Sequence, residues 1–196
     1  MMNTTMVATI FSSSAKGNQL SILRQITLAV VGSLLIAIAS KIQVPFYPVP
    51  MTLQTLMVLT IGMAYGWRLA IATLVLYLLE GAVGLPVFAG TPEKGIGLSY
   101  MLGGTGGYLI GFVIAAGCCG LLAERGWDRS PLTTAATMLI GNGLIYVPGL
   151  LWLGIFYGWD KPILEWGLIP FLFGDMFKIV LASCLMPIIW RFLKKL

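Results

Sequence analysis

Two charged side chains stand in an otherwise apolar segment, FLFGDMFKIV, which runs from Phe171 to Val180. Asp175 and Lys178 are three residues apart, so in a helix they share one face. The pair offers a carboxylate that accepts hydrogen bonds and an ammonium group that donates them. Burying both charges costs desolvation that their mutual attraction often fails to repay. We therefore interpret the pair as the centre of a site for a polar head group; the alternative is a self-neutralising pair without a ligand.

Other polar side chains in apolar segments could complete such a site. Asn142 and Tyr146 are four residues apart near the middle of their segment, so they also share a helix face. Gln54 and Tyr108 stand near the ends of two further segments. Together with the charged pair, these carboxamide and phenol groups supply both donors and acceptors for a hydrogen-bonding ligand.

The same residue types do not make a catalytic set. The chain contains no histidine, and Cys118, Cys119 and Cys184 all lie in apolar runs, so neither a conventional zinc site nor a disulfide framework is expected. No nucleophile stands beside a base with a third residue to orient it. The glycine-rich GGTGGY also lacks the G-x-x-x-x-G-K-[ST] pattern of a nucleotide-binding loop. We predict a binding protein that is not an enzyme and holds no metal or cofactor.

The composition sets the environment of these residues. Of the 196 residues, 58% are hydrophobic and 10% are charged, whereas soluble domains carry about 25% charged residues. So little charge cannot cover a water-exposed surface, and the sequence therefore predicts an integral membrane protein. The net charge of +5 comes largely from basic residues in short connectors and at the C-terminus, which is typical of membrane topology and not of a nucleic-acid groove.

Six apolar segments approach the roughly 20 residues that a membrane-spanning helix needs. They cover Ile22 to Ser40, Thr52 to Tyr65, Trp67 to Val83, Gly104 to Ala123, Leu132 to Tyr157 and Leu168 to Phe192. We expect an all-α bundle of six transmembrane helices over residues 22–196, preceded by a cytoplasmic tail over residues 1–21 in which we recognise no signal peptide.

The basic residues predict the orientation of the bundle. With the N-terminus inside, the cytoplasmic side holds Lys16, Arg24, Arg68, Arg125, Arg129, Arg191, Lys194 and Lys195, and the outer side holds Lys41, Lys94 and Lys161. An excess of basic residues marks the cytoplasmic side, so both termini are expected in the cytoplasm. In this orientation the intramembrane polar residues gather in the outer half, which indicates a pocket open to the outside.

The outer connectors are unusually apolar. VPFYPVP contains three prolines and cannot be helical. The connector GLPVFAGTPEKGIGLSYMLGGTGGY, between the third and fourth spans, is long and rich in glycine. Apolar backbone of this kind is tolerated near membrane depth where it packs on protein or lines a cavity. We predict a re-entrant or capping loop over the pocket, with Glu80 in a rim ion pair with Lys41 or Lys94.

A stripe of small residues runs along the first span. Ala29, Ser33 and Ala37 recur at every fourth position, which allows another helix to approach closely. The spacing fits packing inside the bundle and fits docking of a partner protein equally well.

Four ordered motifs together resemble one known family. VPFYPVPMTLQTLMVL, LYLLEGAVGLPVFAG, GGTGGYLIGF and PFLFGDMFKIVLA occur in this order between about Ala29 and Lys195. They resemble the BioY family, the biotin-specific substrate-binding (S) components of energy-coupling factor (ECF) transporters. The resemblance implies a subunit in the bacterial plasma (inner) membrane that captures biotin from outside. It further implies delivery inward with a transmembrane coupling (T) protein and two cytoplasmic ATPases.

The resemblance also assigns roles to individual residues. The GDxxK motif of the last helix places Asp175 and Lys178 in the biotin site. The implied remainder of the site is Thr52, Gln54, Thr105, Gly107, Tyr108 and Asn142, beside which Tyr146 is expected at the same depth. The stripe of Ala29, Ser33 and Ala37 resembles the face that docks the coupling protein. The alternatives are a solitary biotin transporter or facilitator without ATPases, and an S component for another vitamin.

Overall fold

The computed structural model of the protein describes residues 5–11 and 21–193, and most of them are helical. Each of the six apolar segments contains a helix whose ends lie within two residues of the expected ones. These helices are α2 (Ile22–Lys41), α3 (Gln54–Tyr65), α4 (Trp67–Ala82), α6 (Gly106–Glu124), α7 (Pro131–Tyr157) and α9 (Ile169–Leu193). The shorter elements are α1 (Met6–Phe11), β1 (Gln43–Val44), β2 (Met51–Thr52), α5 (Leu98–Met101) and α8 (Ile163–Gly167).

Local sequence signals explain where several helices begin and end. Ser21 and Ser130 precede α2 and α7, and the hydroxyl oxygen of each accepts a hydrogen bond from a backbone N–H of the first turn. Pro131 follows Ser130 at the first helical position, where no partner for an N–H is needed. Gly66 has a φ of 78°, which a side chain would strain, and it forms the tight corner between α3 and α4.

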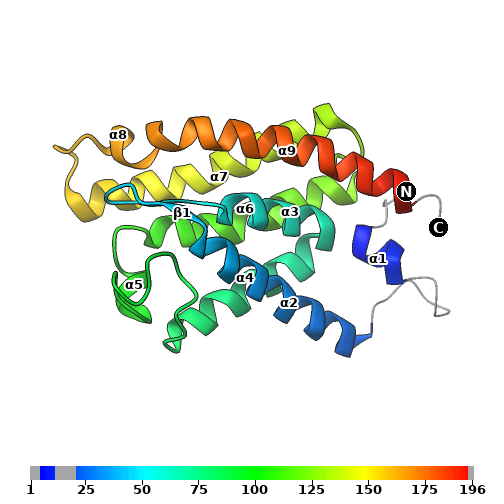
Figure 1. Ribbon diagram of the computed structural model, residues 1–196, viewed down its shortest axis with the longest axis horizontal. Helices are drawn as coiled ribbons and strands as arrows, with labels where there is room; N and C mark the ends of the chain where they lie inside the picture. Colours follow the sequence, from blue (N-terminus) through cyan, green and yellow to red (C-terminus); the bar gives the residue numbers. More distant parts are fainter. Residues whose placement is uncertain (1–4, 12–20, 194–196) are drawn as a thin grey trace.

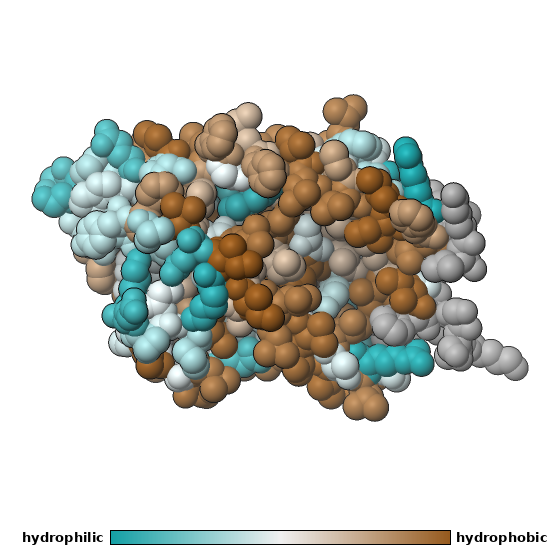
Figure 2. Space-filling view, viewed as in Figure 1, coloured by the Kyte–Doolittle hydropathy of each residue, from teal (hydrophilic) through white to brown (hydrophobic). Residues whose placement is uncertain are grey.

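Four parts of the described chain are long and apolar enough to cross a membrane. They are Ile22–Lys41, Gly106–Glu124, Pro131–Tyr157 and Ile163–Leu193. The chain is therefore a multi-pass membrane protein. Large apolar side chains such as Leu132, Ile155 and Phe173 are more than 70% exposed, as expected for residues that face lipid. Figure 2 shows apolar side chains across the middle of the visible face and hydrophilic side chains mainly toward its two ends.

The helices pack around α6, which contacts α3, α4, α5 and α7. Twelve of its nineteen residues are buried, so α6 forms the middle of the bundle, while α2 packs on α4 and α9 packs on α7. The elements β1, α5 and α8 lie at one end of the molecule, and α1 lies with the last turns of α9 at the other end (Figure 1).

Helix α1 falls within the predicted tail, whose residues 1–4 and 12–20 lie outside the described residues. Met6 and Val7 are buried, and α1 contacts α3 and α9. This part of the chain therefore packs on the bundle. The division into a tail over residues 1–21 and a domain over residues 22–196 stays a prediction.

The small-residue stripe of α2 faces α4 in this structure. Ser33 is fully buried, and its hydroxyl donates a 2.9 Å hydrogen bond to Oε1 of Glu80. Ala29 is buried and Ala37 is half-buried. Of the two alternatives that the spacing left open, the structure therefore shows packing within the bundle at Ser33.

The expected rim ion pair of Glu80 is wrong. Among the described residues, no ion pair joins Glu80 to Lys41 or Lys94. Glu80 accepts from Ser33 instead, and Lys41 Nζ donates to the carbonyl oxygen of Phe88 at 2.8 Å and to Oγ1 of Thr91 at 2.9 Å. The ammonium group thus holds the connector between α4 and α5 against the end of α2.

Candidate functional site

A cavity opens among α3, α6, α7, α9 and the connectors that carry β2 and α5. It contains about 550 Å³ of free space, a volume that includes open solvent at its mouth. Its apolar lining consists of Val49, Pro50, Met51, Ala89, Leu109, Phe112, Ile145 and Phe171, and its polar lining of Thr52, Gln54, Thr55, Tyr100, Thr105, Tyr108, Tyr146, Asp175 and Lys178. An apolar wall with a few converging polar groups is typical of a ligand site.

Asp175 and Lys178 form an ion pair at one end of this cavity. Lys178 Nζ lies 3.0 Å from Asp175 Oδ1, and the two residues are only 7% and 4% exposed. Their spacing on α9 turns both side chains toward α3 and α7 and away from the lipid-facing Met176 and Phe177. The pair that the sequence singled out is therefore buried and lines the cavity.

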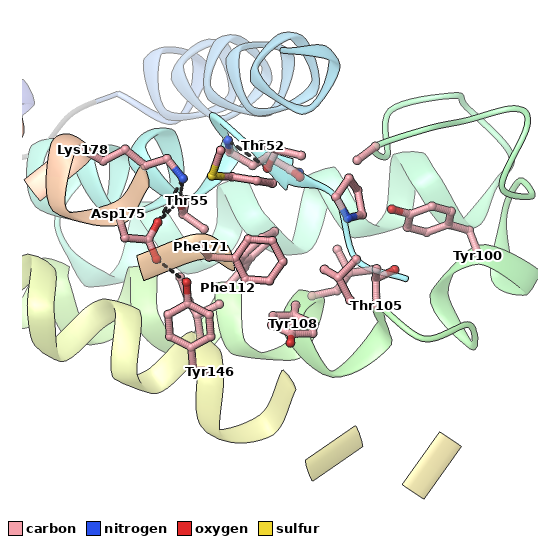
Figure 3. Close-up of a pocket in the computed structure, with 17 residues that line it drawn as sticks. Thr52, Thr55, Tyr100, Thr105, Tyr108, Phe112, Tyr146, Phe171, Asp175 and Lys178 are labelled. Carbon is pink, nitrogen blue, oxygen red and sulfur yellow. Dashed lines mark hydrogen bonds and ion pairs between the residues drawn. The ribbon is translucent and has the colours of Figure 1, made fainter. Parts of the chain in front are cut away.

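Side chains from two other helices complete the hydrogen bonding of the ion pair. The Tyr146 hydroxyl on α7 donates to Asp175 Oδ2 (Figure 3). Lys178 Nζ donates to Thr55 Oγ1 on α3 at 2.8 Å. A buried ion pair is tolerated only when its remaining donors and acceptors are satisfied in this way. Of the three ammonium hydrogens, the described residues take two, so one remains for a ligand.

Aromatic rings form the wall between the two ends of the cavity. Tyr146 stacks on Phe171 with 6.5 Å between ring centroids, and Tyr108 meets Tyr146 edge to face at 6.4 Å. The Tyr108 hydroxyl donates to the backbone carbonyl of Gly167 at 2.8 Å, so Tyr108 contributes its ring to the wall and its only hydrogen to α8. This wall suits a flat or apolar ring system.

Residues from the connectors line the opposite end. Tyr100 on α5 and Thr105 before α6 lie at the far side of the cavity from Asp175 (Figure 3). Tyr100 is 6% exposed and stacks on Phe88 at 4.8 Å. Burial raises the pKa of Tyr100, so its hydroxyl stays protonated and can donate. Thr52 lies nearby on β2, where its Oγ1 accepts from the backbone N–H of Gln54 at 3.2 Å.

The cavity thus collects seven of the residues named from the sequence. These are Thr52, Gln54, Thr105, Tyr108, Tyr146, Asp175 and Lys178. Gly107 and Asn142 do not line it. A Cβ on Gly107 would lie 2.3 Å from the carbonyl oxygen of Pro148, so this glycine allows α6 and α7 to approach. Asn142 is 7% exposed, and within the described residues its buried Oδ1 has no hydrogen-bond partner. Their roles in binding stay predictions.

Sequence reasoning missed several lining residues. Thr55 is the most informative, because it is the residue of α3 that contacts the lysine. It belongs to the TLQT segment, and the signal that could have found it is its position next to Gln54. Tyr100, Phe112 and Phe171 were also missed, because an aromatic residue in an apolar segment carries no mark that separates a cavity wall from a lipid-facing position.

The arrangement can hold a neutral polar head group. Among the described residues no group of three or more His, Cys, Asp or Glu side chains comes together. The acceptors are carboxylate and amide oxygens, and the donors are an ammonium group and hydroxyls. A ligand with both N–H and C=O groups on a ring would match this set.

Comparisons with known proteins agree on one family. The sequence model of the BioY family matches residues 5–195. The chain is 38% identical over 165 residues to the biotin transporter BioY of Thermotoga maritima, covering 82% of this chain and 92% of that protein. It is 35% identical over 159 residues to the probable biotin transporter BioY of Pyrococcus horikoshii, covering 81% and 91% of the two chains.

A solved structure shows the same fold. The crystal structure of the S-component for biotin from an ECF-type ABC transporter superposes with a TM-score of 0.72. The superposition covers 88% of this chain and 95% of that chain, at 21% sequence identity. The expected S-component fold is therefore confirmed at the level of overall architecture.

Proposed function

Because this chain belongs to the BioY family, we propose that it is the biotin-binding subunit of a membrane uptake system and does no chemistry of its own. The observation that carries the proposal is the buried ion pair of Asp175 and Lys178 at the end of an aromatic-walled cavity. A family of transporters needs selective capture, and this cavity provides a hydrogen-bonding end and an apolar wall for it.

The chemistry of biotin fits this cavity. Its ureido ring has two N–H donors and one carbonyl acceptor, its fused thioether ring is apolar, and its tail ends in a carboxylate. The ureido carbonyl accepts from the remaining hydrogen of Lys178, and the ureido N–H groups face the oxygens of Asp175 and Gln54. The thioether ring lies against Tyr146 and Phe171, and the tail points toward Tyr100 and Thr105. Vitamins without a ureido group leave these buried groups unpaired, which supports strong discrimination.

The bundle crosses the membrane six times in this proposal. Helices α3 and α4 have 12 and 16 residues, which at 1.5 Å per residue is about 18 and 24 Å, less than the roughly 30 Å of a hydrocarbon core. Seven residues of α3 are buried, so protein and not lipid surrounds most of it. Pro48, Val49 and Pro50, in the connector before it, are also buried, which supports a short helix at this place.

The cavity opens to the outside, and the termini lie in the cytoplasm. The distribution of basic residues supports this orientation, and so does the position of α1 and the end of α9 at the end of the molecule away from β1 and α5 (Figure 1). The connector of residues 83–105, which Lys41 holds in place, then covers the cavity on the outer side and acts as its cap.

Inward delivery depends on partner proteins, a transmembrane coupling protein and two cytoplasmic ATPases. The S-component fold supports this assembly. The coupling protein docks along α2, where Val30, Leu34 and Ile38 are at least 40% exposed beside the stripe of Ala29, Ser33 and Ala37. The stripe brings α2 close to α4 and so shapes the surface that the partner meets.

Binding of labelled biotin to the purified protein in detergent tests the proposed function. We expect saturable binding that unlabelled biotin displaces and that excess thiamine or riboflavin leaves unchanged. Saturable binding of thiamine or riboflavin without binding of biotin would overturn the assignment.

A further inference from the structure

Gln54 lines the cavity, and a buried tyrosine behind it holds its amide group. Gln54 Nε2 donates to the Tyr77 hydroxyl at 2.6 Å, and the Tyr77 hydroxyl donates to the backbone carbonyl of Val87 at 3.1 Å. Tyr77 is on α4, has no exposed surface and does not line the cavity. The Tyr77 hydroxyl therefore acts on a ligand through the Gln54 amide.

The hydrogen bonds of Tyr77 decide which way the Gln54 amide faces. A phenol has one hydrogen to donate, and a backbone carbonyl can only accept, so the hydrogen of Tyr77 goes to Val87. The phenol oxygen must then accept from Gln54, and the atom that faces it is the amide nitrogen. The reverse amide orientation would place a second acceptor 2.6 Å from the phenol oxygen, and the single phenol hydrogen could satisfy only one of the two.

With its nitrogen bound to Tyr77, the Gln54 amide has its oxygen left for another partner, and Gln54 lines the cavity. No side chain or backbone N–H in the described part of the chain donates to Gln54 Oε1. Gln54 Oε1 is not one of the fully buried polar atoms that lack a partner, so an unpaired Oε1 must keep some accessible surface. An acceptor that is accessible and unpaired in a ligand cavity is available to an N–H donor of the ligand.

We propose that Tyr77 is a specificity-determining positioning residue, which fixes the Gln54 amide so that its oxygen accepts an N–H of the bound ligand. The identity of that N–H as a ureido group rests on the proposed function. The position of the acceptor does not depend on it, since Tyr77 orients the amide for any ligand with a donor at this place.

The connector that caps the cavity is tied to the same tyrosine. The Val87 carbonyl that accepts from Tyr77 also accepts from Ser40 Oγ at 2.8 Å. The next residue, Phe88, meets Tyr77 edge to face at 5.4 Å and stacks on Tyr100, which lines the cavity. Phenylalanine in place of Tyr77 keeps the ring contact with Phe88, and the Val87 carbonyl keeps the Ser40 hydroxyl as a partner, so loss of the Tyr77 hydroxyl acts on Gln54 and leaves the cap in place.

A double-mutant cycle between Tyr77→Phe and Gln54→Met tests the proposal, with the dissociation constant of labelled biotin as the readout. Loss of one hydrogen bond changes an equilibrium constant on the order of fivefold. We expect Tyr77→Phe to weaken binding by about that factor in the wild-type chain and to have no further effect in Gln54→Met, because the residue acts through the amide. The same fold-loss in both backgrounds, or no loss in the wild type, would overturn it.

Tyr65→Phe is the matched control. Its hydroxyl also joins two helices, donating to the Leu28 carbonyl on α2 at 3.1 Å, but it lies outside the cavity. We expect this variant to bind biotin as the wild type does. A loss equal to that of Tyr77→Phe would show a general effect of removing an interhelical hydroxyl and would also overturn the proposal.

A second variant keeps the test decisive where Tyr77→Phe fails to fold. Gln54→Glu has the same shape and keeps an acceptor toward the cavity, but it presents an oxygen in place of the donor that faces Tyr77. We expect weaker biotin binding, and wild-type affinity in Gln54→Glu would contradict a role for Tyr77. If the wild-type protein binds another vitamin and not biotin, the proposed function is overturned. The role of Tyr77 is then tested by the same double-mutant cycle with that vitamin as the ligand.

Discussion

Lys178 and Thr55 are 123 positions apart in the sequence, yet Lys178 Nζ lies 2.8 Å from Thr55 Oγ1. This hydrogen bond joins α9 to α3 beside the cavity. Because Asp175 accepts from the same ammonium group, the threonine fixes the direction in which the third N–H of Lys178 points. Thr55, a neutral residue on a neighbouring helix, thus orients the ammonium group of Lys178 in the site.

Thr55→Val should therefore weaken biotin binding. Valine has nearly the same shape as threonine but cannot accept a hydrogen bond, so Lys178 loses one of its two partners at a cost of about 1–3 kcal/mol. We expect a roughly tenfold higher dissociation constant for biotin, measured with purified protein in detergent. Thr60→Val is the control, because the Thr60 hydroxyl bonds only backbone carbonyls of its own helix. Equal affinities in Thr55→Val and the wild type would show that Thr55 does not orient Lys178 for binding.

Ser33→Leu should reduce the stability of the protein itself. Ser33 has no exposed surface and donates to Glu80, so a leucine overpacks the contact between α2 and α4 and costs about 1–3 kcal/mol. We expect a lower unfolding temperature in detergent and a smaller yield of binding-competent protein. Ser33→Ala loses only the hydroxyl and should bind biotin normally. A stable Ser33→Leu that binds biotin but fails in transport would instead place the partner contact on this residue.

Asp128 gives a prediction about pH at the end of the bundle away from the cavity. Its side chain has no exposed surface, and one oxygen accepts from Trp190 Nε1. Burial raises the pKa of the Asp128 carboxyl, against the opposing effects of Trp190 and Arg129. The folded chain therefore holds this proton more tightly than the unfolded chain, and stability from this group falls as pH rises from the ordinary carboxyl pKa through the raised value.

Asp128→Asn should remove that dependence, since asparagine can still accept from Trp190. Relative to the wild type, we expect a higher unfolding temperature at neutral pH and a difference that shrinks as the pH is lowered through the same range. Unfolding curves of both proteins at a series of pH values measure this difference directly. A destabilised Asp128→Asn, or a difference that does not change with pH, would contradict the assigned cause.

Analogues of biotin can locate its head group in the cavity. Because the ureido N–H groups face buried acceptors, methylation of a ureido nitrogen should weaken binding by two orders of magnitude or more, on the order of 3 kcal/mol. Conversion of the tail carboxylate to a methyl ester should cost about tenfold or less, because Tyr100 and Thr105 are neutral donors. Competition against labelled biotin provides both values. The reverse ranking would place the carboxylate at Lys178.

The helical architecture could be predicted from the sequence because a long apolar segment in a membrane has few alternatives to a helix that satisfies its own backbone hydrogen bonds. The ends of the spans from Ile22 to Tyr157 and of the last span were expected within two residues of where the helices begin and end. Asn142 and Tyr146 were both expected at the depth of Asp175 and Lys178, since buried charges need partners. The structure brings Tyr146 to Asp175, whereas Asn142 does not line the cavity.

Other contacts could not be predicted, for physical reasons. Thr55 is neutral and short, so its presence in an apolar helix costs little, and its position next to Gln54 is the one signal that could have found it. Spacing shows that α2 carries a small-residue face but does not show that this face meets α4, and so Ser33 was not linked to Glu80. Lys41 was expected to find a carboxylate, yet the carbonyl oxygens at a loop satisfy an ammonium group as well.

The central claim is that Asp175 and Lys178 are buried to hold biotin and not merely to neutralise each other. Removing one partner leaves an uncompensated buried charge, which costs about 3–5 kcal/mol and confuses stability with binding. The double variant Asp175→Asn with Lys178→Met removes both charges and should fold with close to wild-type stability. Lys161→Ala, at an exposed ion pair, is the control for loss of a lysine.

The decisive measurement is therefore the dissociation constant of labelled biotin for this double variant, beside its unfolding temperature. We predict a folded protein with an unfolding temperature near that of the wild type and biotin affinity lowered by at least a hundredfold. A folded double variant that binds biotin as tightly as the wild type would contradict the account and leave the pair a structural role alone.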